Sequence, residues 1–576
     1  MLEFGSHAPV AQRIEYWPPK PRVVGSNPAG RATILFMPNH KPYDALIVGG
    51  GHNGLTCACY LAAAGYRVRV LERRSVVGGA AVTEEFFPGF RNSAAAYTVS
   101  LLHPKVIRDL HLAEHGLKIV ERPIANFLPL DAKSYLKIGN ALGQTQTEVG
   151  RFSSRDAERL PDYYAMLERA GNVLRGMLLE TPPNVGGGAR DWLAALRVGY
   201  RMRKAGMAAR RDFLDLMTKS AGDVLDAWFE SDAIKAAFGF DAVVGHYASP
   251  YAPGSAYVLL HHVIGEVNGH RGAWGHAIGG MGAITQAMAK EAERRGVEIT
   301  TDCEVHKICV DERGAQGVQL KDRSMVDGRC VVSNVNPRLL FLNLVEDGVL
   351  DPDFVRRMRR YKCGSGTFRI NVALSELPDF TCLPGKHLQA HHQSGIVIGP
   401  SLAYMEQAYF DARTYGCSRA PIIEMLIPST VDPTLAPPGK HVASLFCQHF
   451  AYDLPNKLAW DEIKEPAADM VMDTVTRHAP NFKAAVLGRK VLSPLDLERD
   501  YGLTGGDIFH GALTLDQIWS ARPVLGHANY RSPIEGLYLC GAGTHPGGGV
   551  SGVPGHNAAR EIVRDLRGRK LGRKKK

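Results

Sequence analysis

One stretch near the N-terminus constrains the fold more than any other. Tyr43–Val48 is a short, mostly apolar run of the kind that a buried parallel strand needs, and Gly49–Gly54 follows at once with the spacing G-x-G-x-x-G. A helix is predicted over Leu55–Ala64 and a second strand over Arg67–Leu71. Glu72 stands at the end of that strand, where its carboxylate can accept hydrogen bonds from ribose hydroxyls. These parts, in this order, predict a βαβ unit that binds a dinucleotide.

Each residue of the glycine motif has a mechanical role. Gly49 allows the tight turn, Gly51 lets the backbone approach a pyrophosphate, and Gly54 lets the helix and strand pack closely. His52 and Asn53 stand at the helix start, where unpaired N–H groups and the positive end of the helix dipole attract an anion. All five residues are therefore predicted to contact the cofactor.

The residues that follow the acid distinguish NAD from FAD. Gly78-Gly79 comes six residues after the acid, and this arrangement resembles the extended FAD motif of the amine oxidase and phytoene desaturase superfamily. In that superfamily an arginine commonly follows the glycine pair and meets the diphosphate, whereas this chain has Ala80 there. Arg73 and Arg74 are available for the adenosine or phosphate end. The resemblance implies that FAD is the cofactor.

The C-terminal part supplies a second glycine-rich turn. Gly536–Cys540 is a short apolar strand, a glycine-rich run follows over residues 541–555, and His556–Leu566 is predicted to be a helix. Glycines beside a strand end let the backbone press against a flat ligand, and the helix start would direct its dipole at the flavin. This run resembles the C-terminal signature of carotenoid desaturases and isomerases. The cofactor-binding residues predicted here are Gly541, Gly543, Gly552 and Val553.

A third piece lies in the middle of the chain. Met281–Arg295 is predicted to be a helix, and strands are predicted over Val297–Thr300 and Glu304–Ile308. In the resembling family the residue that matches Val305 holds the adenine through its backbone. The glycines of Gly279–Gly282 lack the G-x-G-x-x-G spacing, so they do not predict a separate NAD domain.

The predicted fold is α/β, with a Rossmann-like FAD-binding domain built from discontinuous segments and a substrate domain of helices plus sheet. The FAD-binding segments are placed at residues 37–110, 270–340 and 495–566. The substrate domain is placed at residues 111–269, which are mostly helical in pattern, and at residues 341–494, which contain strand-like runs such as Phe368–Leu374.

The two ends of the chain differ from its body. Residues 1–36 are rich in proline and carry no hydrophobic period, so they are interpreted as an unstructured or untranslated extension before Met37. The formal charge of +10 is concentrated at the ends, because the basic tail 567–576 alone holds seven Lys/Arg and no acid. The body is close to neutral, so nucleic acid is not predicted as a partner.

The cysteines indicate the compartment. Ten cysteines are spread through the chain without a CxxC pair, which is typical of reduced thiols in a cytoplasmic protein, or a mitochondrial one if the chain is eukaryotic. The stretch Trp192–Arg211 mixes apolar and basic residues and could lie against a membrane surface, although a basic face on a packed helix is the favoured interpretation. His111–His115 matches H-x-x-E-H but is interpreted as a polar surface helix, so no metal site is predicted.

The predicted function is that of an FAD-dependent oxidoreductase of the desaturase or dehydrogenase type. Flavin N5 would accept a hydride from a small apolar substrate, isoprenoid or lipid-like, and the protein would orient and desolvate it. Such chemistry does not demand a protein acid or base, so no catalytic residue is assigned. Tyr97, His545 and His556 could lie near the flavin, but each could equally be structural. The alternatives are an amine oxidase-type flavoenzyme and a flavin-holding protein that acts mainly through protein partners. The sequence makes no prediction of the oligomeric state.

Overall fold

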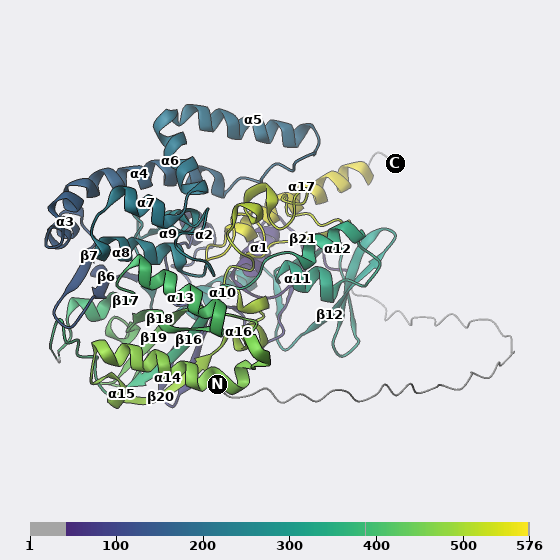
Figure 1. The fold of residues 1–576 in the computed structure, drawn as a ribbon. Coiled ribbons are helices and arrows are strands. Elements are labelled where there is room, and N and C mark those ends of the chain that lie inside the picture. Colours follow the sequence, from purple (N-terminus) through teal and green to yellow (C-terminus); the bar gives the residue numbers. More distant parts are fainter. Residues whose placement is uncertain (1–41, 386, 574–576) are drawn as a thin grey trace, which may run out of the picture. The chain divides into compact units, whose positions relative to one another are not determined.

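A five-stranded parallel sheet forms around the strand that precedes the first glycine turn, in the order β11-β2-β1-β15-β21. The protein is described by a computed structural model that covers residues 42–385 and 387–573 (Figure 1). The sheet takes its strands from three parts of the chain that lie far apart in the sequence. These strands are β1 (Ala45–Val48), β2 (Val68–Leu71), β11 (Glu298–Thr300), β15 (Val331–Ser333) and β21 (Leu537–Leu539).

Both faces of this sheet are covered, because alternate residues of β1 enter different cores. Ala45 and Ile47 pack with three helices on one face, and Leu46 and Val48 pack on the other with the antiparallel strands β12-β13-β14. The helices on the first face are α1 (His52–Ala63), α10 (Gly282–Arg294) and α17 (Val553–Arg573). The antiparallel strands are β12 (Val305–Asp311), β13 (Gly314–Leu320) and β14 (Met325–Asp327).

A second, mixed sheet has seven strands in the order β20-β16-β19-β18-β17-β6-β7, and only the β17–β6 pair is parallel. Its strands are β6 (Ile124–Pro129), β7 (Tyr135–Gly139), β16 (Thr367–Leu374), β17 (Gly395–Ile398), β18 (Cys417–Leu426), β19 (His441–Phe450) and β20 (Val486–Leu492). The α/β class with a discontinuous parallel sheet and a mixed substrate-domain sheet is confirmed. The residue boundaries of the two domains stay a prediction.

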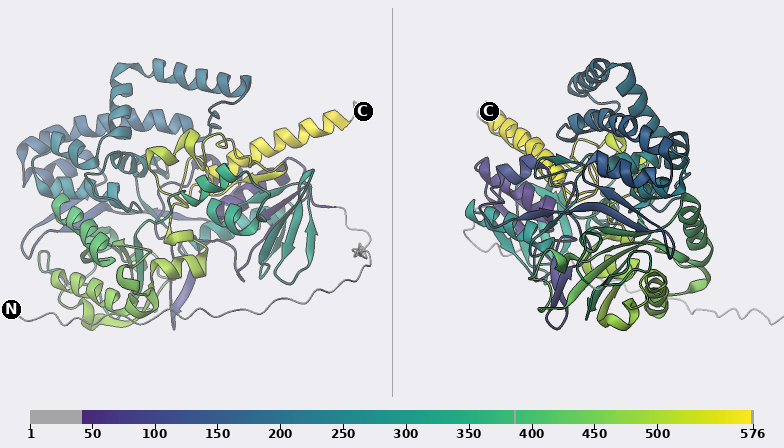
Figure 2. Two further views of the ribbon diagram at one scale, coloured as in Figure 1. Left: turned by 45° about the vertical axis from the view of Figure 1, so that its right-hand side comes forward. Right: turned by 90° about the vertical axis from the view of Figure 1, so that its left-hand side faces the viewer.

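Helices cover both faces of the mixed sheet (Figures 1 and 2). Alternation in β6 shows this: Phe127 packs in the core that includes α14 (Trp460–His478), and Leu128 packs in the core of the large helical layer. That layer comprises α3 (Leu142–Gly150), α4 (Ser154–Leu178), α5 (Ala189–Lys204), α6 (Gly206–Thr218), α7 (Ala221–Trp228), α8 (Asp232–Val243), α9 (Ala256–Val263) and α13 (Leu402–Tyr415).

Shorter elements connect these layers. The strands are β3 (Thr83–Phe87), β4 (Phe90–Ser93), β5 (Ile119–Glu121), β8 (Glu266–Val267), β9 (His270–Arg271) and β10 (Gly275–Ala277), and the helices are α2 (Pro104–Asp109), α11 (Pro337–Leu339), α12 (Pro352–Arg359), α15 (Phe482–Ala485) and α16 (Pro494–Tyr501). Within residues 42–385 and 387–573, no helix combines the length and the apolar character needed to cross a membrane.

Two local predictions differ from the structure. The H-x-x-E-H run at His111–His115 lies in turns after α2, not in a helix, because His111 adopts a positive φ of 50° that ends the helix. α17 continues to Arg573, so the first residues of the predicted tail 567–576 extend the last helix instead of leaving it. The predictions for residues 1–36 and for Met37 lie outside the described residues.

Candidate cofactor and substrate cavity

The first glycine turn leads directly from β1 into α1. Gly49 adopts φ +96°, which favours glycine, and its N–H donates to the carbonyl oxygen of Leu71 over 2.9 Å. α1 begins at His52, and no side chain caps its N-terminus. The first N–H groups of the helix are therefore available to an anionic ligand at this point.

Glycine backbone lies against glycine backbone beside this helix start. Gly78 donates its N–H to the carbonyl oxygen of Gly50 over 2.9 Å. A Cβ atom on Gly79 would lie 3.4 Å from the Cα of Gly51, and a Cβ on Gly51 would lie 2.8 Å from Asn334 Nδ2. The two glycine motifs thus form one backbone surface without side chains, which fits the close approach of a diphosphate.

Glu72 holds this surface in place from the end of β2. Its buried carboxylate accepts from the N–H of Gly50 over 2.8 Å and from the N–H of Arg74 over 3.0 Å. The guanidinium of Arg74 pairs with Glu84 and lies 4.8 Å from the centre of the Tyr501 ring. Glu72 is therefore hydrogen-bonded to the glycine turn and also lines the adjacent cavity.

A cavity of about 290 Å³ extends from this surface, near the lower end of the range for small-molecule sites. Ten of the predicted cofactor-binding residues line it. They are Gly49, Gly51, His52, Asn53, Glu72, Arg73, Arg74, Gly79, Ala80 and Val305. The fold therefore brings together residues from α1, from the region after β2 and from the start of β12 in one cavity.

The other five predicted residues lie behind the cavity wall, where their small size allows segments to pack. A Cβ on Gly54 would lie 2.3 Å from the Gly49 carbonyl oxygen, and a Cβ on Gly541 would lie 2.6 Å from that of Asn334. A Cβ on Gly543 would meet Pro337 at 2.4 Å, and one on Gly552 would meet Val106 at 2.9 Å. Val553 is buried at the start of α17. Their direct contact with a cofactor stays a prediction.

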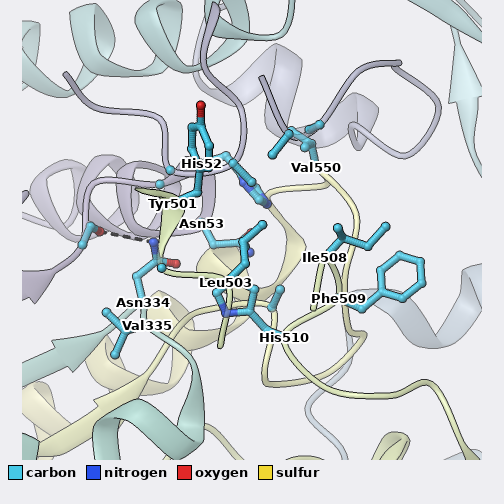
Figure 3. A pocket seen from close by; sticks show the side chains of 18 of the residues that line it. His52, Asn53, Asn334, Val335, Tyr501, Leu503, Ile508, Phe509, His510 and Val550 are labelled. Atoms are coloured by element: carbon cyan, nitrogen blue, oxygen red, sulfur yellow. Dashed lines mark hydrogen bonds between the residues drawn. The ribbon is translucent and has the colours of Figure 1, made fainter. Parts of the chain in front are cut away.

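Several lining residues were not predicted. Figure 3 shows side chains from α1, from the end of β15 and from the C-terminal part arranged around one space. These additional residues include Asn334, Val335, Tyr501, Leu503, Ile508, Phe509, His510, Ala542, Gly549 and Val550. Phe509 and His510 belong to the run Phe509–Gln517, which reaches the cavity through the fold and carries no cofactor motif of its own.

Four buried polar atoms on cavity-lining residues have no hydrogen-bond partner among the described residues. They are His52 Nε2, Asn53 Oδ1, Arg74 Nη1 and His510 Nδ1. Burial lowers the pKa of both His52 and His510 to about 4, so both imidazoles are neutral at pH 7. Unpaired buried polar atoms are costly in an empty protein, and a polar ligand in the cavity would satisfy them. The residues present thus fit a flavin cofactor.

The far half of the cavity, meaning the lining outside the two glycine motifs, Glu72 and the start of β12, is largely apolar but also includes Thr98, Ser100 and His262. Ala95, Ala96, Leu101, Val244 and Trp274 line it together with Ile508 and Phe509. Tyr97 also lines it, but its hydroxyl turns to Glu424 Oε2 at 2.6 Å. Glu424 in turn lies 3.3 Å from Arg122 Nη1.

Burial, reinforced by Glu424, raises the pKa of Tyr97 well above 10. The phenol therefore stays protonated and donates to the carboxylate. Glu424 is thus occupied by a phenol and a guanidinium and does not present a free charge to the cavity.

A buried arginine fixes the loop that closes one wall. Arg522 is fully buried and donates to five carbonyl oxygens, among them those of Phe509 and Ala542, each 2.8 Å from Nη2. The other three acceptors are the carbonyl oxygens of Gly511, Ala512 and Gln517. One side chain therefore ties the Phe509–Gln517 run to the second glycine turn.

The three residues noted as flavin neighbours are not all at the cavity. Tyr97 lines it, whereas His545 Nε2 lies 3.1 Å from the carbonyl oxygen of Met177 and the His556 ring packs on Tyr60 at 4.9 Å. In the part of the chain that the structure describes, no group of three or more His, Cys, Asp or Glu residues could hold a metal ion.

Comparison with known proteins gives consistent matches. The family model described as flavin containing amine oxidoreductase matches residues 54–368. Pyridine nucleotide-disulfide oxidoreductase domain-containing protein 2 of Rattus norvegicus is 43% identical over 548 residues, which cover 92% of this chain and 94% of the rat protein. The lycopene-forming phytoene desaturase of Pseudescherichia vulneris is 25% identical over 88% of this chain and 96% of its own length.

Among solved structures, the cyclohexylamine oxidase from Brevibacterium oxydans IH-35A superposes with a TM-score of 0.54. The two chains are 16% identical, and the match covers 92% of this chain and all of the oxidase, so the likeness concerns the fold alone. The resemblance inferred from the glycine motifs is confirmed by these matches.

Proposed function

Because this chain belongs to the family of flavin-containing amine oxidoreductases, we propose that it is an FAD-dependent oxidoreductase of the desaturase or dehydrogenase type. FAD, when bound, would supply the hydride acceptor at its N5 atom for a C–H bond of an apolar, isoprenoid or lipid-like substrate. The match to a phytoene desaturase supports this substrate class.

The observation that carries the proposal is the division of one cavity into two chemically different halves. Backbone amides at the α1 start, Glu72 and Arg74 line one half, which suits the dinucleotide part of FAD. Leu101, Val244 and Trp274 line the other half, which suits an apolar substrate. His52 and His510, both neutral at pH 7, also line the cavity.

The chain's own residues have positioning roles in this scheme. Glu72 holds the Gly50 amide, and Arg522 holds the Phe509–Gln517 run, so both walls are fixed before a ligand enters. The apolar residues of the far half exclude water from the substrate. This arrangement binds and orients the reactants and assigns no proton transfer to a side chain.

The far half of the cavity favours an apolar substrate over an amine. A buried ammonium group needs a carboxylate partner, and the acids that line this cavity, among the described residues, are Glu72 and Glu304 at the dinucleotide end. Glu424 is already paired with Tyr97 and Arg122. A flavin-binding protein that acts only through protein partners would not need an apolar half in the same cavity.

Anaerobic flavin reduction tests the proposal. The purified protein with bound FAD is mixed with limonene or squalene and, separately, with benzylamine or putrescine, and the flavin absorbance band is followed. We expect bleaching by at least one apolar compound and none by the amines. Bleaching by amines alone would establish the amine oxidase alternative, and no bleaching by either class would favour the partner-based role.

A variant that fills the far half sharpens the test. Ala96 lines the cavity, so Ala96→Phe should remove reduction by the apolar compound while FAD content remains. Ala63→Phe, at an exposed position near the end of α1, is the matched control and should behave as the unmodified protein. If both variants were reduced equally well, the apolar half would not be the substrate site.

A further inference from the structure

Helix α5 contributes almost nothing to the core of the protein. It is 16 residues long, and none of its residues is buried. Figures 1 and 2 show it at the outer edge of the helical layer, beyond α4 and α6. Ala194, Val198 and Met202 are half-buried on its inner side. The packing of the core therefore does not explain why its outer side is apolar.

The outer side of α5 carries a stripe of large exposed side chains. Trp192, Leu196 and Tyr200 follow one another at intervals of four residues, which places them on one face, and they are 70%, 66% and 67% exposed. Leu193, at 58% exposure, lies one turn of the helix from Leu196 and extends the same face. Single exposed apolar residues are ordinary, but a contiguous stripe of this kind marks a binding surface.

The charges around this stripe are positive. Arg197, Arg203 and Lys204 are exposed, and none of them forms an ion pair with another described residue. Asp191, the acid in the first turn of α5, accepts from the N–H of Asn184 over 2.8 Å and is turned toward the protein. The outer face is therefore apolar and cationic without compensating acids.

We propose that α5 docks on the surface of an anionic lipid bilayer. Its apolar stripe would lie in the plane of the interface, Trp192 and Tyr200 would stand at the depth of the headgroups, and the three free cations would meet lipid phosphates. This combination fits a bilayer better than a second copy of the chain, because pairing two such faces would bring like charges together. The proposal does not depend on the identity of the substrate.

Vesicle sedimentation tests the proposal. The full-length protein is mixed with vesicles of equal parts phosphatidylcholine and phosphatidylglycerol, and with vesicles of phosphatidylcholine alone. We expect binding to the anionic vesicles that weakens at high salt, and little binding to the neutral ones. Replacing the three free cations (Arg197→Gln, Arg203→Gln and Lys204→Gln) should weaken binding by about fivefold for each charge, or about a hundredfold together.

The apolar stripe is tested separately. The triple variant Trp192→Ser, Leu196→Ser and Tyr200→Ser should reduce binding by at least about tenfold. Met325→Ser, Leu388→Ser and Phe410→Ser remove the same number of exposed apolar side chains from other elements and should leave binding unchanged. The control for charge is the triple variant Arg359→Gln, Arg360→Gln and Lys440→Gln, all at exposed positions.

Three results would overturn the proposal. Equal binding to neutral and anionic vesicles would remove the role of the cations. Unchanged binding by the two α5 variants would place the contact elsewhere on the protein. A dimer without vesicles that the apolar α5 variant converts to a monomer, measured by light scattering, would make this face an interface between copies of the chain.

Discussion

A Cβ on Gly51 would lie 2.8 Å from Asn334 Nδ2, and both residues line the cavity, so a branched side chain at position 51 would displace Asn334 and take up space at the cavity wall. Gly51→Val should therefore nearly abolish FAD binding, measured as flavin bound per protein after purification. Gly143→Val is the matched control, because a Cβ at Gly143 in α3 meets nothing within 4 Å. Normal FAD content in Gly51→Val would show that this turn is not the phosphate cradle.

Glu72 should contribute less than the glycine turn but act in the same place. Glu72→Ala removes two acceptors, for the N–H groups of Gly50 and Arg74, and we expect FAD affinity to fall by about 1.5–3 kcal/mol, the cost of a charged hydrogen bond. Glu72→Gln keeps one acceptor and should lose less. Titration of the apoprotein with FAD measures both variants, and equal affinity in all three proteins would remove Glu72 from the site.

At the scale of elements, Arg522 should control the order of the Phe509–Gln517 run. Arg522→Lys cannot reach five carbonyl oxygens at once, so we expect faster hydrogen exchange in this run and a lower FAD affinity. Arg313→Lys is the control, because this exposed arginine lies in the turn between β12 and β13. Unchanged exchange in Arg522→Lys would mean that the run is held by its other contacts.

The elements of the first βαβ unit could be predicted to within a few residues, because apolar period, glycine spacing and the terminal acid agree there. The strands β6 and β7 could not, since the segment 111–269 is mostly helical in pattern and β6 joins the mixed sheet through a parallel pair with β17, far away in the chain. Pairing over such a separation leaves no local pattern.

The same limit applies to the site. Gly49, Gly51, His52, Asn53 and Glu72 could be assigned to the cavity because one motif contains them all. Asn334 and Phe509 reach the cavity only after three segments come together. Gly541 and Gly543 show a related limit: a glycine indicates that something approaches closely, but only the fold shows that Asn334 and Pro337 pack against these two positions.

At the scale of the whole molecule, stability should fall in mild acid. Burial lowers the pKa values of a set of histidines to about 3 or 4; they are His52, His246, His261, His262, His391, His449, His510 and His545. An unfolded histidine titrates near about 6.5. Between pH 6.5 and about 4 the unfolded chain therefore binds more protons than the folded one, and stability decreases as pH falls.

Thermal unfolding at pH 7.5 and pH 5.0 measures this effect. Each buried histidine contributes up to about 1.4 kcal/mol per pH unit below its unfolded pKa, so the midpoint should be clearly lower at pH 5.0. His449→Phe should reduce the dependence, since both of its ring nitrogens lack partners in the described structure. His306→Phe, at an exposed position, should not. Equal midpoints at both pH values would contradict the assignment of neutral buried imidazoles.

The measurement that tests the account most directly is the identity of the bound cofactor. The protein is purified without added flavin, its absorbance spectrum is recorded, and the ligand released by acid is identified by mass spectrometry. We predict a yellow protein with about one non-covalently bound FAD per chain, as expected for a dinucleotide at a glycine-turn βαβ unit. A colourless protein that cannot be reconstituted with FAD would contradict the central claim.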